Sequence, residues 1–224
     1  MPESRLLVEQ SYNNGQNVQE MSEASASPAF RRAEPDVRRL SLIEACARVL
    51  ARSGAAGASV RAIAQEAGAS VGLVGHYFGG VDALVAATYD HIDRRVAEAL
   101  DLAVAAAGPA PQDRLEAFVT ASFAPPIADT ALLATWIAFW SLVTARKDIA
   151  RQHDEQYALY RARLEALLGD CGVPVSARRR HAIAVTALVD GLWLELCLSP
   201  GCFTPEEARD IARGFLASIT SSGR

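Results

Sequence analysis

The pattern of apolar and polar positions predicts helices along most of the chain. Near the front, within Ser59–Phe78, the apolar residues Val60, Ile63, Ala64 and Ala67 recur at spacings of three and four. Residues spaced this way lie on one face of a helix. The segment therefore begins with a short amphipathic helix.

A second short helix follows after a tight turn. Gly68 can adopt left-handed backbone angles without steric cost, so it can end the first helix. Ser59 and Ser70 stand where N-caps belong, and Val71 and Val74 continue an apolar face into the second helix. A helix, a glycine turn and a capped helix form the pattern of a helix-turn-helix, whose second helix enters the DNA major groove. A plain helical hairpin would show the same pattern, so both interpretations stay open from these residues alone.

The remaining periodicity predicts an all-α protein of about nine helices. A helix from about Pro35 to Gly54 would complete a three-helix head, and a long helix would run from Asp82 to about Ala107. Five further segments have helical character: Gln112–Ala124, Asp129–Ala145, Ile149–Cys171, Ser176–Leu198 and Pro205–Ile219. These segments predict a helical body, and none of the chain shows a convincing strand pattern.

Composition divides the chain into three regions. Residues 1–33 begin with a stretch rich in Ser, Asn, Gln and Glu, which predicts a disordered extension, with Met21 as an alternative start. Residues 34–94 are expected to form the head, and residues 95–224 the body. Half of the residues are hydrophobic, which is enough for a sizeable core.

Charge supports a nucleic-acid partner only weakly. The formal net charge is −4, yet residues 30–80 hold seven arginines against four acidic residues. Basic charge gathered around the helical hairpin suits a surface that faces phosphates. Arg38 and Arg39 could reach phosphate, although solvated surface charge is an equally good explanation for them.

The sequence offers little for metal, cofactor or membrane binding. The four cysteines have no C-x-x-C spacing and no neighbouring histidine pair, so neither a metal site nor a cofactor is expected. The longest apolar run, Ala182–Leu198, is interrupted by Asp190 and Glu195 and is too short and acidic for a good membrane span. A reduced cytoplasmic location is therefore expected.

One motif suggests an enzyme. Gly68–Gly72 matches G-x-S-x-G, the nucleophile elbow of serine hydrolases, with Ser70 as the nucleophile. That elbow needs a preceding strand, whereas the residues before it have helical spacing. His76, His91, His153 and His181 are scattered and offer no clear base partner. We therefore expect a chance match and no enzymatic activity.

The chain resembles TetR-family transcriptional regulators from about Pro35 to Ile219, most clearly over Ser59–Leu84. The stretches Gly72–Phe78, Trp136–Trp140 and Asp190–Leu194 also resemble the choline-responsive BetI branch of that family. The resemblance implies a homodimeric repressor that binds a palindromic operator in double-stranded DNA. It further implies that a small effector bound in the body releases the DNA.

The resemblance also assigns roles in DNA binding. It implies that Ser59 and Arg61 lie near phosphates and that His76 and Tyr77 bind them. Base edges or thymine methyls would be contacted by four residues: Ser70, Val71, Leu73 and Gly75. The family usually has a phosphate-binding lysine just after the aromatic pair, where this chain has Val81.

An effector pocket is predicted from the aromatic residues of the body. Trp136 and Trp140 share a helix face, and Asp190 lies three residues before Trp193 in a largely apolar helix. Aromatic faces attract quaternary ammonium groups, and a buried carboxylate supplies the countercharge. Trp136, Phe139, Trp140, Asp190 and Trp193 are therefore expected to line a pocket for a choline-like cation. Ordinary core packing is the alternative for each aromatic taken singly.

The predicted helix Ser176–Leu198 is apolar on nearly every side from Ile183 onward. Such a helix must be covered, and a second subunit that pairs it and Pro205–Ile219 with their copies is a natural cover. Two alternatives to a choline-type repressor remain: a TetR-like regulator with a more apolar effector, and a helical scaffold that has lost DNA binding.

Overall fold

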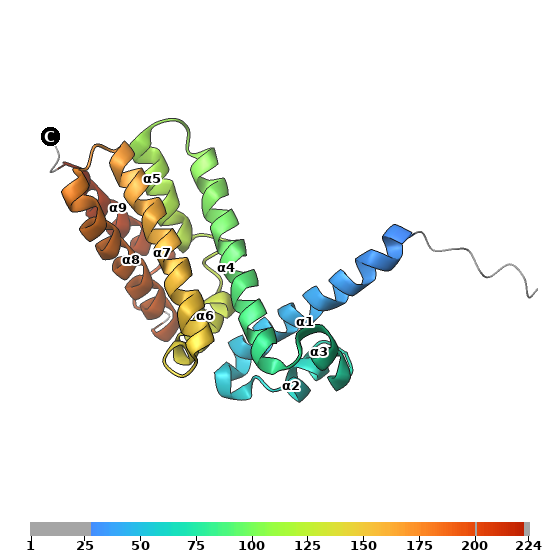
Figure 1. The fold of residues 1–224 in the computed structure, drawn as a ribbon. Helices are drawn as coiled ribbons and strands as arrows, with labels where there is room; N and C mark the ends of the chain where they lie inside the picture. The colour runs from blue at the N-terminus through green and yellow to red at the C-terminus, as the bar shows by residue number, and fades with distance from the viewer. Residues whose placement is uncertain (1–27, 200, 222–224) are drawn as a thin grey trace, which may run out of the picture. The chain divides into compact units, whose positions relative to one another are not determined.

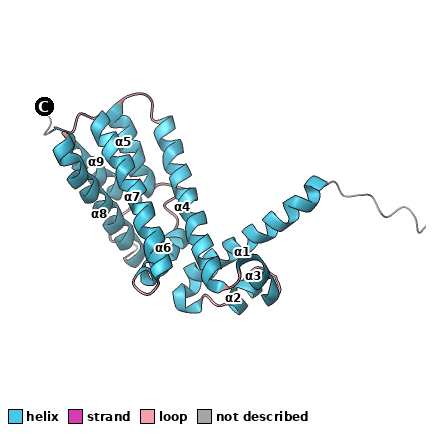
Figure 2. Cartoon of the chain, viewed as in Figure 1, coloured by secondary structure: helices cyan, strands magenta, loops and turns pink. Residues whose placement is uncertain are grey.

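The computed structural model describes residues 28–199 and 201–221. These residues form nine α-helices and one short 3₁₀ helix, and they contain no strand (Figure 2). The all-α prediction is therefore confirmed. The chain divides into two compact units, Met1–Arg38 and Arg39–Arg224. Of the disordered extension predicted for residues 1–33, residues 1–27 lie outside the described residues, whereas residues 28–33 belong to a helix, so that part of the prediction was wrong.

Helix α1 covers Pro28–Gly57 and begins earlier than the sequence suggested. Pro35 was expected in the first turn, but it lies inside the helix, so that prediction was wrong. Pro28 offers the same start signal, and the alanines and arginines between the two prolines favour helix. Gly54 has a φ of 64° and interrupts the helix, close to where its end was predicted.

The hairpin consists of α2 (Val60–Glu66) and α3 (Val71–Phe78), which confirms the predicted pair of helices. The Ser59 hydroxyl accepts a hydrogen bond from the Ala62 N–H at 3.2 Å, as a capping residue should. Ser70 occupies the N-cap of α3, but its side chain makes no capping hydrogen bond. The predicted N-cap position of Ser70 is therefore confirmed, whereas the hydrogen bond expected from its hydroxyl is not formed.

A shared apolar core joins α2 and α3 to α1 and to the next helix. The buried side chains at its centre are Leu42, Cys46, Leu50, Ile63, Val74 and Leu84. The long helix α4 (Val81–Ala106) follows α3 at a bend of 68°. Among the described residues, no single helix is long and apolar enough to cross a membrane, and α3 and α4 meet that test only as a bent pair.

The body consists of α4 and the elements that follow it in the chain (Figure 1). These are α5 (Pro111–Thr120), the 3₁₀ helix η1 (Ala121–Phe123), α6 (Thr130–Val143), α7 (Lys147–Asp170), α8 (Val175–Leu198) and α9 (Pro205–Ser221). Helix α4 packs against α5, η1 and α7, while α8 packs against α7 and α9 against α5. The five helical segments predicted for this region are all present. Their ends differ from the predicted ones by a few residues.

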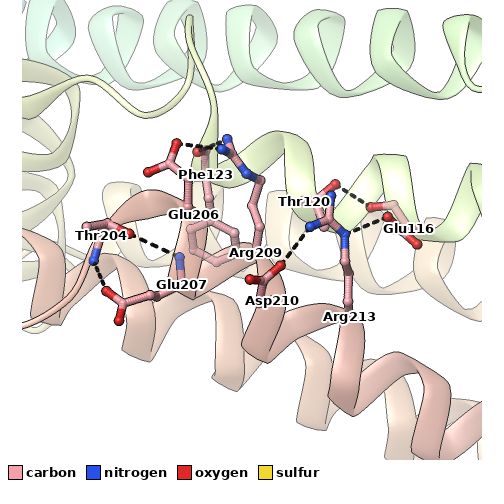
Figure 3. Close-up of polar contacts among 9 residues, drawn as sticks. All are labelled: Glu116, Thr120, Phe123, Thr204, Glu206, Glu207, Arg209, Asp210 and Arg213. Atoms are coloured by element: carbon pink, nitrogen blue, oxygen red, sulfur yellow. Dashed lines mark hydrogen bonds and ion pairs between the residues drawn. The ribbon is translucent and has the colours of Figure 1, made fainter.

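Arginines attach α9 to the rest of the body (Figure 3). Arg213 donates to the Glu116 carboxylate of α5 at 2.7 Å, and Arg209 donates to the Phe123 carbonyl of η1 at 3.0 Å. Thr204 and Glu207 bond each other's backbone N–H groups and form a capping box at the start of α9. The hydrogen bond from Arg209 holds η1 against α9, and η1 forms one wall of the cavity described below.

Two glycines of α3 give opposite predictions for stability. Gly79 ends the helix with a φ of 75°, while Gly75 lies inside it, and a Cβ at either position meets no atom within 4 Å. Gly79→Ala should lower the free energy of unfolding by about 1–2 kcal/mol, because a left-handed residue with a Cβ is strained. Gly75→Ala should raise it by about 0.5–1 kcal/mol through helix propensity. Urea unfolding measures both, and a change in the same direction for the two variants would contradict this assignment.

Candidate functional site

The exposed face of α3 is the first part of the candidate site. Val71 is 53% exposed although it is apolar, and Ser70, Gly75 and His76 are exposed beside it. Leu73 is half-buried and packs partly against the core. This face combines small, apolar and hydroxyl groups without acidic residues, so it can approach DNA closely.

The end of α3 and the start of α2 hold most of the polar groups predicted to meet phosphate. The rings of His76 and Tyr77 pack edge to face with centroids 5.0 Å apart, and Tyr77 is half-buried. Arg61 is exposed near the start of α2. Arg38 is also exposed, but it belongs to the first unit, so its predicted role remains a prediction.

Arg39 has a different environment from the one the sequence suggested. Its guanidinium lies over the ring of Phe78, 5.1 Å from the centroid, in a cation–π contact. This contact links α1 to the last residue of α3. It therefore helps to position the end of α3, the second helix of the helix-turn-helix, which we call the recognition helix. Sequence spacing alone gives no sign of this pair, which lies far apart along the chain.

The second part of the candidate site is a cavity of about 80 Å³ in the body. It lies among α4, η1, α6, α7 and α8. Five aromatic side chains line it: Trp136, Trp140, Tyr157, Tyr160 and Trp193. Two carboxylates, Asp93 of α4 and Asp190 of α8, also face it, and no basic residue lines it.

Four of the five residues predicted for this pocket are brought together, but Phe139 does not line it. The Phe139 ring is fully buried behind Trp136 and packs against Tyr89 at a centroid distance of 4.9 Å. Helical spacing puts Phe139 next to Trp136, and their ring centroids are 5.8 Å apart, yet the Phe139 ring lies in the core and not in the cavity lining. The prediction for Phe139 was therefore wrong, and it supports the wall of the pocket from behind.

Sequence reasoning missed Asp93, Tyr157 and Tyr160. The Tyr157 and Tyr160 positions follow the apolar face of α7 and look like core residues, while Asp93 lies among other charged residues of α4. The signal that could have revealed Asp93 is its place one turn before Val96 and two turns before Leu100, on the face that meets the body.

The two carboxylates lie in an environment that disfavours their charged form. Burial raises the pKa of Asp190 to about 6, although the Tyr157 hydroxyl, which donates to its Oδ1 at 3.2 Å, and the more distant Arg161 oppose this. Burial, and then the charge of Asp90, raises the pKa of Asp93 to about 6. Within the described part of the chain, neither carboxylate has a basic group within 4 Å. A cationic ligand would supply the missing countercharge.

A row of polar contacts leads from the cavity to α4. The ring of Tyr157 stacks on His153 at a centroid distance of 4.1 Å, and His153 Nδ1 is hydrogen-bonded to the Tyr89 hydroxyl at 3.3 Å. Partial burial lowers the pKa of His153, which favours the neutral form of its ring. On the opposite wall, the Trp193 indole N–H donates to the Ser122 carbonyl at 2.7 Å, so this edge of the indole is already bonded.

Comparison with known proteins identifies the family. Residues 42–88 match the model of bacterial regulatory proteins of the tetR family, and residues 111–221 match that of the BetI-type transcriptional repressor C-terminal region. The HTH-type transcriptional regulator BetI of Burkholderia thailandensis is 36% identical over 81% of this chain and 92% of its own. The chain belongs to the TetR family. It is a helix-turn-helix transcriptional repressor with a BetI-type C-terminal domain.

Solved structures of TetR-like regulators share the fold. A putative transcriptional regulator from Pseudomonas aeruginosa PAO1 has a TM-score of 0.76 and 40% identity, and covers 87% of this chain and 98% of its own. A putative regulator from Saccharomonospora viridis, solved in complex with choline, has a TM-score of 0.70 and 19% identity, and covers 81% of this chain and 96% of its own.

Membership of this family also decides the question raised by the hydrolase-like motif. Ser70 lies between two helices of the TetR head, not between a strand and a helix. The families and relatives that match are transcriptional regulators and not enzymes. The G-x-S-x-G match is thus a coincidence of the glycines and the cap residue that build the helix-turn-helix.

The half-buried Asp190 of this TetR-family protein predicts a distinctive pH dependence. The pKa of Asp190 is raised in the folded state, so its ionisation destabilises the ligand-free protein as pH rises through about 6. Asp190→Asn should therefore raise the free energy of unfolding by about 1–3 kcal/mol at pH 8, with no gain below about pH 4. Denaturant unfolding at several pH values measures this difference.

The exposed Glu155, which lies on the neighbouring helix α7, offers a matched control. Glu155→Gln should leave the free energy of unfolding nearly unchanged at every pH. A destabilised Asp190→Asn protein at pH 8 would contradict the description of Asp190 as a carboxylate whose charged form is disfavoured in the folded protein.

Proposed function

We propose that this repressor binds its operator as a homodimer through α2 and α3 and is released by a small organic cation of the choline type. The cavity in the body is the proposed effector site. The observation that carries the proposal is the pair of carboxylates, Asp93 and Asp190, in an aromatic cavity with no basic residue in its lining.

The chemistry of the cavity favours a quaternary or bulky ammonium group over other ligands. Trp136, Trp140 and Trp193 line the cavity, and aromatic ring faces attract a cation without needing a hydrogen-bond donor from it. Asp190 and Asp93 supply negative charge, and the Trp136 indole N–H is buried with no partner among the described residues. That free donor suits a hydroxyl oxygen on the ligand. The choline complex of the Saccharomonospora viridis regulator, which shares the fold, supports the same class of ligand.

For the DNA, we assign base contacts to the exposed face of α3 and phosphate contacts to its ends. Ser70, Val71, Leu73 and Gly75 would face base edges or thymine methyls, and the free hydroxyl of Ser70 supports a hydrogen-bonding role there. Phosphates would be held by Ser59, Arg61, His76 and Tyr77, with Arg38 as a further candidate.

For the dimer, we assign the interface to α8 and α9. Apolar side chains on these helices are exposed in the single chain: Val175, Ile183, Leu194 and Leu198 on α8, and Ile211 on α9. A second copy packed against them around a two-fold axis would cover this surface, and would place two recognition helices on one duplex.

The effector is tested by titrating choline against a complex of the protein with the DNA upstream of its own gene. Fluorescence anisotropy should show release at millimolar choline or below, and Asp190→Asn should need at least about tenfold more choline, because the cation loses its countercharge. The uncharged isostere 3,3-dimethyl-1-butanol should not release the DNA. No release by millimolar choline would remove the choline assignment, and equal release by the isostere would favour an apolar effector instead.

Val81 gives a separate prediction for DNA binding. It is the first residue of α4, half-buried, at the position where relatives often have a phosphate-binding lysine. Val81→Lys should steepen the log–log dependence of operator affinity on salt by about two units per dimer, since each new phosphate contact adds about 0.9. Val81→Met is the uncharged control of similar length. An unchanged slope in the lysine variant would show that this position does not face phosphate.

A further inference from the structure

One arginine connects the body to the start of α4, next to the recognition helix. Arg146 is the N-cap residue of α7 and is only 19% exposed in its side chain. Its Nη1 donates to Asp82 Oδ1 at 2.8 Å, and its Nη2 donates to the Asp82 carbonyl at 3.2 Å. Asp82 lies in the first turn of α4, directly after the glycine turn that ends α3.

The guanidinium is held in place from its other side. Asp148 accepts from Arg146 Nε at 3.2 Å and from Nη2 at 2.5 Å, in a bidentate pair. These hydrogen bonds raise the pKa of Arg146 and lower that of Asp148. Asp148 thus orients the planar fork of Arg146 so that the remaining donors reach Asp82.

Two further contacts continue this row along α4. Gln152 Nε2 donates to the Ala86 carbonyl at 3.3 Å, and His153 bonds the Tyr89 hydroxyl. Positions 82, 86 and 89 lie on one face of α4. The first turns of α7 therefore lie alongside the first turns of α4. His153 in turn stacks on Tyr157, which donates to Asp190 in the cavity. The row therefore runs from the cavity to the turn between α3 and α4.

We propose that Arg146 is a positioning residue for operator binding, which holds the start of α4, and with it the recognition helix, in the orientation that fits DNA. A ligand in the cavity that displaces α7 would break the contact between Arg146 and Asp82 and release the head. The claim about operator binding does not depend on the effector. The claim about release rests on the proposed choline-type ligand.

The experiment compares two arginines that link the same pair of helices. Arg146→Met removes the contact near the recognition helix, and Arg163→Met removes the ion pair with Asp101 at the far half of α4, where the N···O distance is 2.6 Å. Without effector, Arg146→Met should weaken binding to the upstream DNA about tenfold, a typical size for coupling between two sites. Arg163→Met should change it less than about twofold, because an exposed ion pair contributes little.

Two further variants separate positioning from folding. Asp82→Asn changes a side chain that is 81% exposed, so it should fold normally and weaken DNA binding by about threefold, since the bond to the Asp82 carbonyl remains. Its effect should be largely lost in the Arg146→Met background, as expected for two residues that act through one contact. Arg146→Lys should restore part of the affinity. Unchanged or tighter DNA binding by Arg146→Met and Asp82→Asn would overturn the proposal, as would an equal loss in Arg163→Met.

The effector arm uses choline and two readouts. The ratio of the operator dissociation constant with saturating choline to that without choline should be several-fold smaller in Arg146→Met than in the wild type. Calorimetry on the DNA-free variant should show that choline binding is not weakened. A ratio equal to that of the wild type would overturn the role in release. If choline does not bind the wild-type protein, the proposed effector fails, and the operator measurements still decide the role of Arg146.

Discussion

The central physical constraint in this protein is the half-buried carboxylate of Asp190, which forms no ion pair among the described residues. Asp190 faces an aromatic cavity, and its one short polar contact among the described residues is the hydroxyl of Tyr157. Removing an ion from water costs free energy that a single neutral hydrogen bond only partly offsets. Asp93 adds a second carboxylate with the same raised pKa. We therefore expect the ligand-free body to be less stable at neutral pH than it would be with neutral residues at these positions, and a bound cation would offset that cost.

The free-energy cost of these carboxylates in the ligand-free protein could be coupled to DNA binding through α4. Helix α4 belongs to the core of the head through Leu84 and to the wall of the cavity through Asp93. An effector acts on an equilibrium only through contacts that differ between the two states. Since one helix contacts both sites, the proposed effector could act on the head through a small movement of the body end of α4. The hydrogen bonds from Arg146, Gln152 and His153 of the α7 region to α4 are discrete contacts that a movement of α7 would break.

The sequence predicts the head better than the pocket, for physical reasons. The head depends on local signals, such as Ser59 at a cap and Gly68 and Gly79 at left-handed positions, which act within a few residues. The pocket depends on which side chains converge from four α-helices and η1. Periodicity does not give the rotation of each helix about its own axis in the packed body. Trp136 and Asp190 were found because tryptophans and a carboxylate in apolar helices are conspicuous. Phe139 was misplaced and Asp93 was missed because their surroundings are set by tertiary packing.

Proton release on cation binding tests this account of Asp190 and Asp93 most directly. At about pH 6 the carboxyls of Asp190 and Asp93 are each partly protonated, and a bound cation lowers their pKa. Calorimetric titration of choline at this pH, in two buffers with different ionisation enthalpies, measures the protons exchanged. The account predicts release of about half to one proton per protomer near pH 6, falling toward zero at pH 8. Choline binding with no proton release at pH 6, or with proton uptake, would contradict it.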